Sequence, residues 1–370
     1  MNQIVAPSSQ HTLQLGTAIL PYLADHRIGE AIVMPAAAYL ELVLAVGISV
    51  TRGQPCVLEE VQFQQPLFLG PQLVTVRISL WSLSRALWRF EIESATDGGA
   101  NWIVHAVGQL HATELPPRPK PMALPKLLDR CVEQYTAAEH LTAMQARRIN
   151  YGPSFQVVQT ISRRDGEALA QLQLPQALQS EAQFYRIHPV LLDGAIQSIA
   201  STRLEDIRPA LPVAVASLAV YQRPRSRLWC HVVVDNCASD GPSNANLTLA
   251  DESGVVVAVL RGVCIQPVSS PRPMESRAVG SVVTGAKEGA ASDPALENRL
   301  SAIWKDVLGL RQLENNDRFS DLGGDSITAT QIADKAKRAG IDVTPQVILE
   351  TQTISNLVGT IIARKKELTS

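Results

Sequence analysis

The chain has 370 residues, of which 46% are hydrophobic and 18% are charged, and its formal net charge is −2. This composition is typical of a soluble globular protein with two or three domains, and it gives no reason to expect nucleic acid or a membrane as a partner. The five cysteines include no CxxC pair, so we expect reduced thiols and no metal site. The N-terminal residues do not resemble a signal peptide, and we therefore expect a cytoplasmic location.

The first motif lies near the N-terminus. Residues 11–16 predict a short strand. His26 follows on a connection, and Pro35 stands nine residues after it, just before an apolar run. Because proline is favoured in the first helical turn, this pattern predicts a core helix over 36–46. A lone histidine in a connection is most often structural, so His26 gains significance only if a similar arrangement recurs.

Strands are predicted after this helix. Apolar and polar residues alternate over 74–81 and 88–93. The turn Asp97-Gly98-Gly99 predicts a hairpin between 88–94 and 102–110. The elements together predict one long helix packed on an antiparallel sheet. The proline-rich segment 113–125 cannot continue a sheet and is interpreted as a solvated linker.

The second half repeats this plan. A helix is expected over 128–145, followed by a turn at Tyr151-Gly152-Pro153. Strands are predicted later, over 228–235, 247–250 and 255–265, with a turn before the last strand that favours antiparallel pairing.

Between that turn and those strands, a His-Pro pair again precedes an apolar helix, expected over 188–200. Asp193 and Gln197 lie on one face of this helix because four residues separate them. A carboxylate on an otherwise apolar helix must be paired, neutralised or catalytic, since burying a lone charge is costly. One half therefore supplies a histidine and the other an acid, which suggests a pseudo-dimeric fold with one composite site.

The C-terminal region differs in composition. Residues 266–293 are rich in Pro, Ser, Gly and Ala, which predicts a flexible tether. From residue 294 the pattern is helical, with helices expected over 296–308 and 327–339, after Thr344-Pro345, and over 354–364. Ser326 stands where an N-cap serine is expected, and capping alone would explain it.

The motifs of the first two halves resemble the dehydratase domain of modular polyketide synthases. The matching residues are His26, Pro35, Tyr151, Gly152, Pro153, His188, Pro189, Asp193 and Gln197. Glu30 and Ala36 stand where that family usually has glycine. The resemblance implies an α+β double hotdog fold, with two antiparallel sheets that each wrap a long helix. The hotdog halves are then expected at 1–112 and 126–268, with a linker at 113–125 between them.

The same resemblance implies a reaction, the loss of water from a 3-hydroxyacyl thioester to give a 2-enoyl thioester. His26 is the implied base and Asp193 the implied acid, its pKa raised by an apolar pocket, with Gln197 orienting it. The backbone N–H groups after Pro35, from Ala36 onward, are expected to stabilise the thioester oxygen.

The roles of Tyr151 and Gly152 stay open at this point. They either contact the substrate or form a turn that only supports packing. Alternatives to dehydration are an isomerase or pyran-forming cyclase that uses the same pocket, and a non-catalytic docking module. The presence of both a histidine and an acid favours dehydration.

The sequence DLGGDSI at 321–327 resembles the carrier domains of polyketide and nonribosomal peptide synthetases. We therefore expect a tether at 269–293 and an all-α, four-helix carrier domain at 294–366. The resemblance implies that Ser326 carries 4'-phosphopantetheine, added by a separate phosphopantetheinyl transferase. Residues 328–346 look more like a peptidyl than an acyl carrier, so the class of synthase stays open. Implied partners are other assembly-line modules, such as a ketosynthase and a ketoreductase, and a second copy in a homodimer.

Overall fold

The computed structural model describes residues 6–70, 72–95, 101–202, 208–235, 243–267, 293–308, 310, 312–319, 321–322 and 326–367. Residues 269–292 of the expected tether at 269–293, and the turn Asp97-Gly98-Gly99, lie outside these residues. The chain divides into two compact units, of which one holds most of residues 1–267 and the other most of residues 268–370. Among the described helices, none combines the length and the apolar character that a membrane span requires.

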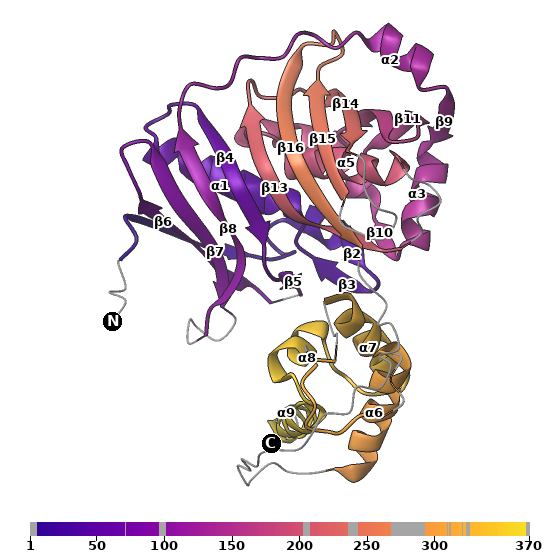
Figure 1. Ribbon diagram of the computed structural model, residues 1–370. Coiled ribbons are helices and arrows are strands. Elements are labelled where there is room, and N and C mark those ends of the chain that lie inside the picture. Colours follow the sequence, from indigo (N-terminus) through magenta and orange to yellow (C-terminus); the bar gives the residue numbers. More distant parts are fainter. Residues whose placement is uncertain are drawn as a thin grey trace. The chain divides into compact units, whose positions relative to one another are not determined.

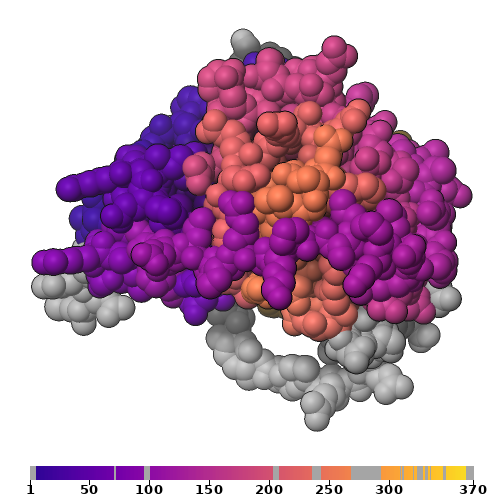
Figure 2. All heavy atoms as spheres, turned by 90° about the horizontal axis from the view of Figure 1, so that it is seen from above, coloured from indigo at the N-terminus to yellow at the C-terminus, as the bar shows by residue number. Residues whose placement is uncertain are grey.

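The larger unit consists of two halves that lie side by side (Figure 2). The first half contains β1 (Ser9–Leu15), β2 (His26–Ile28), β3 (Ala31–Val33), α1 (Ala36–Val50), β4 (Cys56–Phe63), β5 (Phe68–Leu69), β6 (Val74–Ser82), β7 (Leu87–Ala95) and β8 (Ile103–Ala112). The second half contains α2 (Leu124–Arg130), β9 (Glu133–Thr136), α3 (Ala137–Ala146), β10 (Ile149–Tyr151), β11 (Val158–Arg164), β12 (Glu167–Gln173), α4 (Gln176–Gln179), α5 (Pro189–Gln197), β13 (Ala210–Val220), β14 (Arg227–Val234), β15 (Ser243–Ala250) and β16 (Val256–Pro267).

One antiparallel sheet runs through both halves. Its twelve strands follow the order β1-β6-β7-β8-β4-β13-β16-β15-β14-β12-β11-β9. The halves join where β4 pairs with β13, with Val61 opposite Val215 and Leu58 opposite Leu218. A small four-stranded sheet, β10-β2-β3-β5, contains strands from both halves. The double hotdog expected from the sequence is confirmed, and its two sheets form one continuous sheet.

The 15-residue helix α1 and the nine-residue helix α5 lie against the large sheet (Figure 1). α1 packs on β4 and β8, α5 packs on β12 and β15, and the two helices contact each other. Gly47 lets α1 approach the sheet closely, because a Cβ there would lie 2.8 Å from a methyl group of Leu110. All nine residues of α5 are buried. Any polar side chain on α5 therefore needs a partner inside the protein.

The helix expected over 128–145 is wrong, because two helices and a strand occupy this region. α2 ends at Arg130, and β9 then pairs with β11 at the edge of the large sheet. Thr136 begins α3 with a capping box, in which its hydroxyl accepts from the Glu139 N–H and the Glu139 carboxylate accepts from the Thr136 N–H. The capping box starts a new helix and prevents a continuous one.

The segment between the halves, residues 113–123, is irregular and largely exposed. It is attached to the second half at two turns. The Met122 N–H donates to the Gly254 carbonyl at 2.8 Å, and Arg118 donates to Gln222 and to the Tyr221 carbonyl. Gly254 has a φ of +86°, and a Cβ there would lie 2.6 Å from the Met122 oxygen. Position 254 therefore requires glycine, both for its backbone conformation and for the close approach of Met122.

The smaller unit contains the four helices expected from the sequence, α6 (Pro294–Leu308), α7 (Ser326–Arg338), α8 (Pro345–Thr351) and α9 (Ile354–Glu367). Trp304 and Phe319 are fully buried at its centre and meet edge to face, with ring centroids 4.9 Å apart. Thr344 caps α8 by accepting the Val347 N–H at 3.4 Å. This unit has a hydrophobic core of its own, separate from that of the double hotdog.

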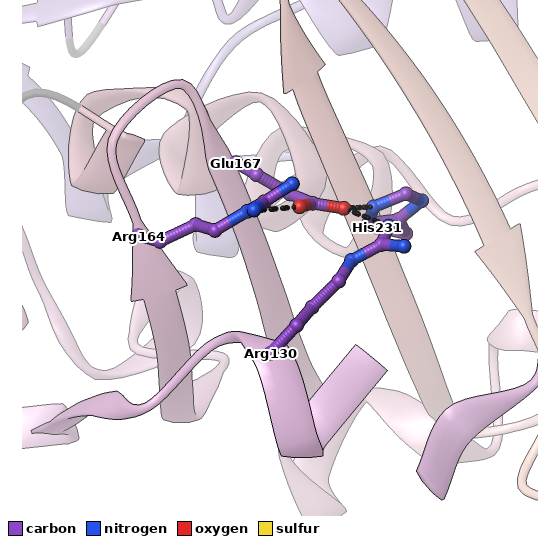
Figure 3. A network of polar contacts seen from close by, with 4 residues as sticks. All are labelled: Arg130, Arg164, Glu167 and His231. Atoms are coloured by element: carbon purple, nitrogen blue, oxygen red, sulfur yellow. Dashed lines mark hydrogen bonds and ion pairs between the residues drawn. The ribbon is translucent and has the colours of Figure 1, made fainter. Parts of the chain in front are cut away.

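A buried carboxylate connects α2 to the strands β12 and β14 of the same half (Figure 3). Glu167 on β12 accepts from Arg130 of α2, from His231 Nε2 at 2.6 Å and from Arg164 Nε at 2.7 Å. Burial alone would raise the pKa of Glu167, but these three donors outweigh it and lower the pKa to about 2. Glu167 therefore remains ionised and stabilises the fold at neutral pH.

We expect Glu167→Gln to lower the free energy of unfolding by about 1–3 kcal/mol at pH 7, because it weakens the charge-assisted hydrogen bonds that the buried carboxylate accepts from Arg130 and Arg164. The carboxylate contribution is complete above the ordinary pKa of 4.5 and is lost as the pH falls toward about 2. Urea unfolding at pH 7 and pH 3 should therefore show a smaller difference between variant and wild type in acid.

The control is Glu252→Gln, in which the exposed carboxylate pairs only with the exposed Arg227 at 3.5 Å. It should change the free energy of unfolding by less than about 1 kcal/mol. Equal effects of the two substitutions at pH 7 would contradict the role assigned to Glu167.

Candidate active site

His26 is fixed by the hairpin of β2 and β3. Its Nδ1 lies 2.7 Å from the Val33 carbonyl oxygen, and since a carbonyl only accepts, Nδ1 carries the proton. In the neutral ring, Nε2 then holds a free electron pair. Gly29 has a φ of +59° in the turn between the strands. This turn therefore has its glycine at position 29, one residue before Glu30. Gly29 adopts the left-handed conformation, which is strained for a residue with a side chain such as glutamate.

The start of α5 presents the acid. Pro189 is in the first turn, and His188 caps the helix by accepting the Val190 N–H on Nδ1 at 3.2 Å. His188 Nε2 then donates to Glu181 at 3.2 Å. Asp193 follows one turn later on a helix that has no exposed face. Capping by His188 therefore sets where α5 begins and which way Asp193 points.

His26 and Asp193 meet across the two halves. His26 Nε2 and Asp193 Oδ1 are 3.8 Å apart, and the two residues are 8% and 4% exposed. Burial raises the pKa of Asp193, while His26 and Gln197 lower it by smaller amounts. The pair thus places an imidazole on one strand beside a helical carboxyl whose pKa is raised by burial.

Gln197 holds the second oxygen of Asp193. Its Nε2 donates to Asp193 Oδ2 at 2.8 Å and to the Phe155 carbonyl at 3.2 Å. Both partners act as acceptors, so the amide nitrogen must face them. When Asp193 is neutral, Oδ2 is occupied as an acceptor, and the proton lies on Oδ1, which faces His26.

The loop after β10 forms an aromatic wall beside His26. The Tyr151 and Phe155 rings lie 5.6 and 5.1 Å from the imidazole, measured between centroids. Asp25 connects this loop to the His26 strand: its carbonyl accepts the Gly152 N–H at 2.7 Å, and its carboxylate accepts the Ser154 N–H at 2.8 Å. The loop that holds Tyr151 and Gly152 is therefore attached to the residue next to His26.

Pro35 and Ala36 begin α1, just beyond Val33. Pro35 is the N-cap with an extended backbone, and its carbonyl accepts the Ala38 N–H at 2.9 Å. Through Val33, the start of α1 is linked to the His26 ring. Within the described residues, neither Pro35 nor Ala36 forms a hydrogen bond or a ring contact with His26 or Asp193.

A second link between the halves passes through Glu41 of α1. Its carboxylate accepts the backbone N–H groups of Arg186 and Ile187 at 2.6 and 3.1 Å. Burial raises the pKa of Glu41 to about 7, and the two backbone donors oppose this rise. Glu41 thus holds the backbone at residues 186–187, directly before His188 and α5.

The sequence did not indicate Asp25, Phe155, His140 or Ser201 as parts of the site. His140 on α3 is buried, with Nε2 3.4 Å from Gln197 Oε1 and Nδ1 3.3 Å from Ser201 Oγ. Two weak signals were available in the sequence. Asp25 directly precedes His26, and His140 lies within the stretch that was expected to be helical. Neither pattern indicates a site without the fold that brings these elements together.

In the smaller unit, Ser326 is the first residue of α7, whereas the sequence placed it at the N-cap position just before the helix. Residues 323–325 of the DLGGDSI motif lie outside the described part of the chain. Within the described residues, no group of three His, Cys, Asp or Glu side chains is placed to hold a metal ion.

Known families match both units. Residues 5–95 match the polyketide synthase dehydratase domain, and residues 119–275 match the polyketide synthase dehydratase N-terminal domain. Residues 298–361 match the phosphopantetheine attachment site.

Individual proteins give the same result. A mycocerosic acid synthase-like polyketide synthase of Mycobacterium tuberculosis is 28% identical over 278 residues, which are 72% of this chain and 13% of that protein. The spectinabilin polyketide synthase system protein NorA of Streptomyces orinoci is 30% identical over 275 residues, 70% of this chain and 13% of that protein. The chain thus spans only a small part of these relatives. The dehydratase domain from the CurJ module of the curacin polyketide synthase aligns with a TM-score of 0.63 and 26% identity, covering 72% of this chain and 95% of that domain.

We expect Gly152→Ala to destabilise the fold, because a Cβ at this position would lie 2.3 Å from Asp25 Oδ1. Asp25 must then move and release the Ser154 N–H, which costs about 1–3 kcal/mol. Urea unfolding measures this loss. Gly70→Ala is the matched control, since nothing lies within 4 Å of its Cβ position. A Gly152→Ala variant as stable as Gly70→Ala would contradict the contact between Asp25 and the loop.

Proposed function

The chain joins a dehydratase domain of the polyketide synthase family to a phosphopantetheine attachment domain, and we propose that the dehydratase domain removes water from a 3-hydroxyacyl thioester to give a 2-enoyl thioester. The observation that carries this proposal is the separation of 3.8 Å between His26 Nε2 and Asp193 Oδ1. A base and an acid at this spacing both reach neighbouring carbons of one acyl chain.

His26 is the base in this reaction. The α-proton next to a thioester carbonyl is weakly acidic and needs a general base, for which histidine is the most frequent side chain. Because Nδ1 donates to the Val33 carbonyl at 2.7 Å, the basic electron pair is on Nε2. The Val33 carbonyl also stabilises the imidazolium that forms when Nε2 takes the proton.

Asp193 is the acid. Its burial favours the protonated carboxyl, and Gln197 leaves the proton on Oδ1. His26 Nε2 takes the α-proton, the electrons of that C–H bond form the new C=C bond, and the bond between the β-carbon and its oxygen breaks. The departing oxygen takes the proton of Asp193 Oδ1 and leaves as water. Return of the proton from His26 to Asp193 restores both groups.

Charge that develops on the thioester oxygen needs a hydrogen-bond donor. The backbone N–H groups of Ala36 and Ala37 are in the first turn of α1, where helix N–H groups lack partners within the helix. They also lie at the positive end of a helix dipole. We assign this role to the start of α1, and Tyr151 and Gly152 to the wall beside the substrate.

Ser326 is the proposed attachment point of 4'-phosphopantetheine. It begins α7, a helix of 13 residues, and the N-terminus of such a helix favours an attached phosphate. When attached, the group supplies a thiol that carries the acyl chain as a thioester. Three proposed partners follow from this chemistry: a phosphopantetheinyl transferase, and a ketosynthase and ketoreductase that deliver the 3-hydroxyacyl chain. A second copy of the chain, in a homodimer, is proposed separately because hotdog domains often pair.

Turnover of a 3-hydroxyacyl thioester tests the reaction directly. Wild type should produce the absorbance of a conjugated enone-type thioester, and His26→Ala and Asp193→Asn should each lower kcat/KM by about 100- to 10,000-fold, the usual contribution of general acid or base catalysis. His11→Ala, a histidine on the outer strand β1, is the control and should retain activity. If no chain length is turned over, or if both site variants retain wild-type rates, dehydration is wrong.

Intact-mass analysis tests the carrier assignment. After phosphopantetheinylation and loading with a 3-hydroxyacyl chain, wild type should gain the arm and the acyl group and then lose the mass of one water. We expect Ser326→Ala to gain neither group. Asp193→Asn should gain both and lose no water, which separates attachment from dehydration. Modification of the Ser326→Ala variant would overturn the assignment of the attachment site.

A further inference from the structure

A buried histidine lies behind the site and takes no part in the mechanism above. His140 on α3 is 3% exposed and contacts Gln197 and Ser201. Ser201 belongs to the short 3-10 helix that follows α5. His140 therefore connects a separate helix to the one residue that holds Asp193 Oδ2.

The hydrogen-bond roles in this chain follow from one another. Gln197 Nε2 faces two acceptors, Asp193 Oδ2 and the Phe155 carbonyl, so Gln197 Oε1 faces His140. An amide oxygen only accepts, and His140 Nε2 must then carry the proton. His140 Nδ1 accepts from the Ser201 hydroxyl. Burial lowers the pKa of His140 to about 4, which agrees with this neutral ring.

The orientation of the Gln197 amide has a consequence for the acid. A terminal amide has two nearly equal orientations that differ by a half-turn, and its partners select one. If the donor at Oε1 is lost, the amide orientation depends on the Phe155 carbonyl and Asp193 Oδ2 alone, and the turned orientation becomes more populated. The turned amide presents Oε1 to Asp193 Oδ2, and two acceptors then face each other. The carboxyl relieves this by carrying its proton on Oδ2, away from His26 and from the substrate.

We propose that His140 is a positioning residue that locks the Gln197 amide and so keeps the acidic proton of Asp193 on Oδ1. The proposal rests on the proposed dehydration, in which Oδ1 delivers that proton. The other ionisable groups that face Asp193 are His26 from β2 and Tyr151 from β10, and neither contacts the Gln197 amide oxygen in the interactions recorded for the described residues.

The test compares variants at His140 in the full chain. His140→Phe keeps the ring shape and removes the donor, and His140→Met is a second apolar variant that adapts more easily to the space. His140→Gln replaces the donor, because its amide nitrogen reaches the place of Nε2. His105→Phe is the matched control: His105 is an equally buried histidine in the first half, bonded to Ser94 and to the Gln65 carbonyl.

We expect the apolar variants to lower kcat by about 10- to 100-fold with little change in KM, because proton placement and not substrate binding is lost. His140→Gln should recover most of this loss. The alkaline limb of the kcat profile should move to higher pH in the apolar variants, since an acceptor against Oδ2 disfavours ionised Asp193. His105→Phe should lower stability without moving this limb.

A measurement without substrate separates this proposal from the proposed reaction. Carbon-13 NMR of the Asp193 carboxyl gives its pKa directly, and this pKa should rise in His140→Phe or His140→Met and not in His105→Phe. Unchanged Asp193 titration in a folded apolar variant, or kcat equal to wild type, would overturn the role of His140. Absence of turnover in wild type would instead refute the dehydration, and the Asp193 titration would still decide whether His140 locks the amide.

Discussion

The structure depends on one constraint, the burial of a carboxyl on a helix that has no exposed face. Asp193 belongs to α5, in which every residue is buried. A carboxyl in such a place favours its neutral form, because ionisation removes it from water without full compensation. His26 lies beside it, but the separation of 3.8 Å is too long for a direct hydrogen bond. In the proposed dehydration, the two groups act on neighbouring carbons of one acyl chain.

The continuous sheet brings these two side chains together. β4 and β13 pair along the junction, so the two halves cannot move independently without breaking a ladder of backbone hydrogen bonds. α1 and α5 contact each other on this sheet. Glu41 adds a link from α1 to the backbone that leads into α5, and Asp25 adds one from β2 to the loop after β10. The composite site is thus held by several connections between the halves, each carried by buried or nearly buried groups.

Much of this could be predicted from local sequence, and the remainder depends on contacts distant in the chain. The motifs around His26 and Asp193 predicted the two core helices. A proline that starts a helix and the apolar residues that follow it are neighbours in the chain, so local sequence is enough to recognise them. The helix expected over 128–145 is wrong because β9 owes its strand form to β11, a partner that local periodicity does not reveal. His140 was missed for the same reason: its partners lie 57 and 61 residues away in the chain. The links to Asp25 and Glu41 are equally non-local.

In three buried carboxyl groups, the neighbouring charges and hydrogen-bond donors determine whether the pKa is lowered or raised. Glu167 meets two arginines and a histidine, and its pKa falls to about 2, so it is an ionised structural group. Glu41 accepts two backbone N–H groups and feels two more distant arginines, and burial still raises its pKa to about 7. Asp193 meets a single amide and an imidazole, and burial raises its pKa as well. A cation beside Asp193 would lower its pKa, as the arginines do for Glu167. In the proposed dehydration, Asp193 serves as the acid because burial raises its pKa and the groups around it do not reverse this rise.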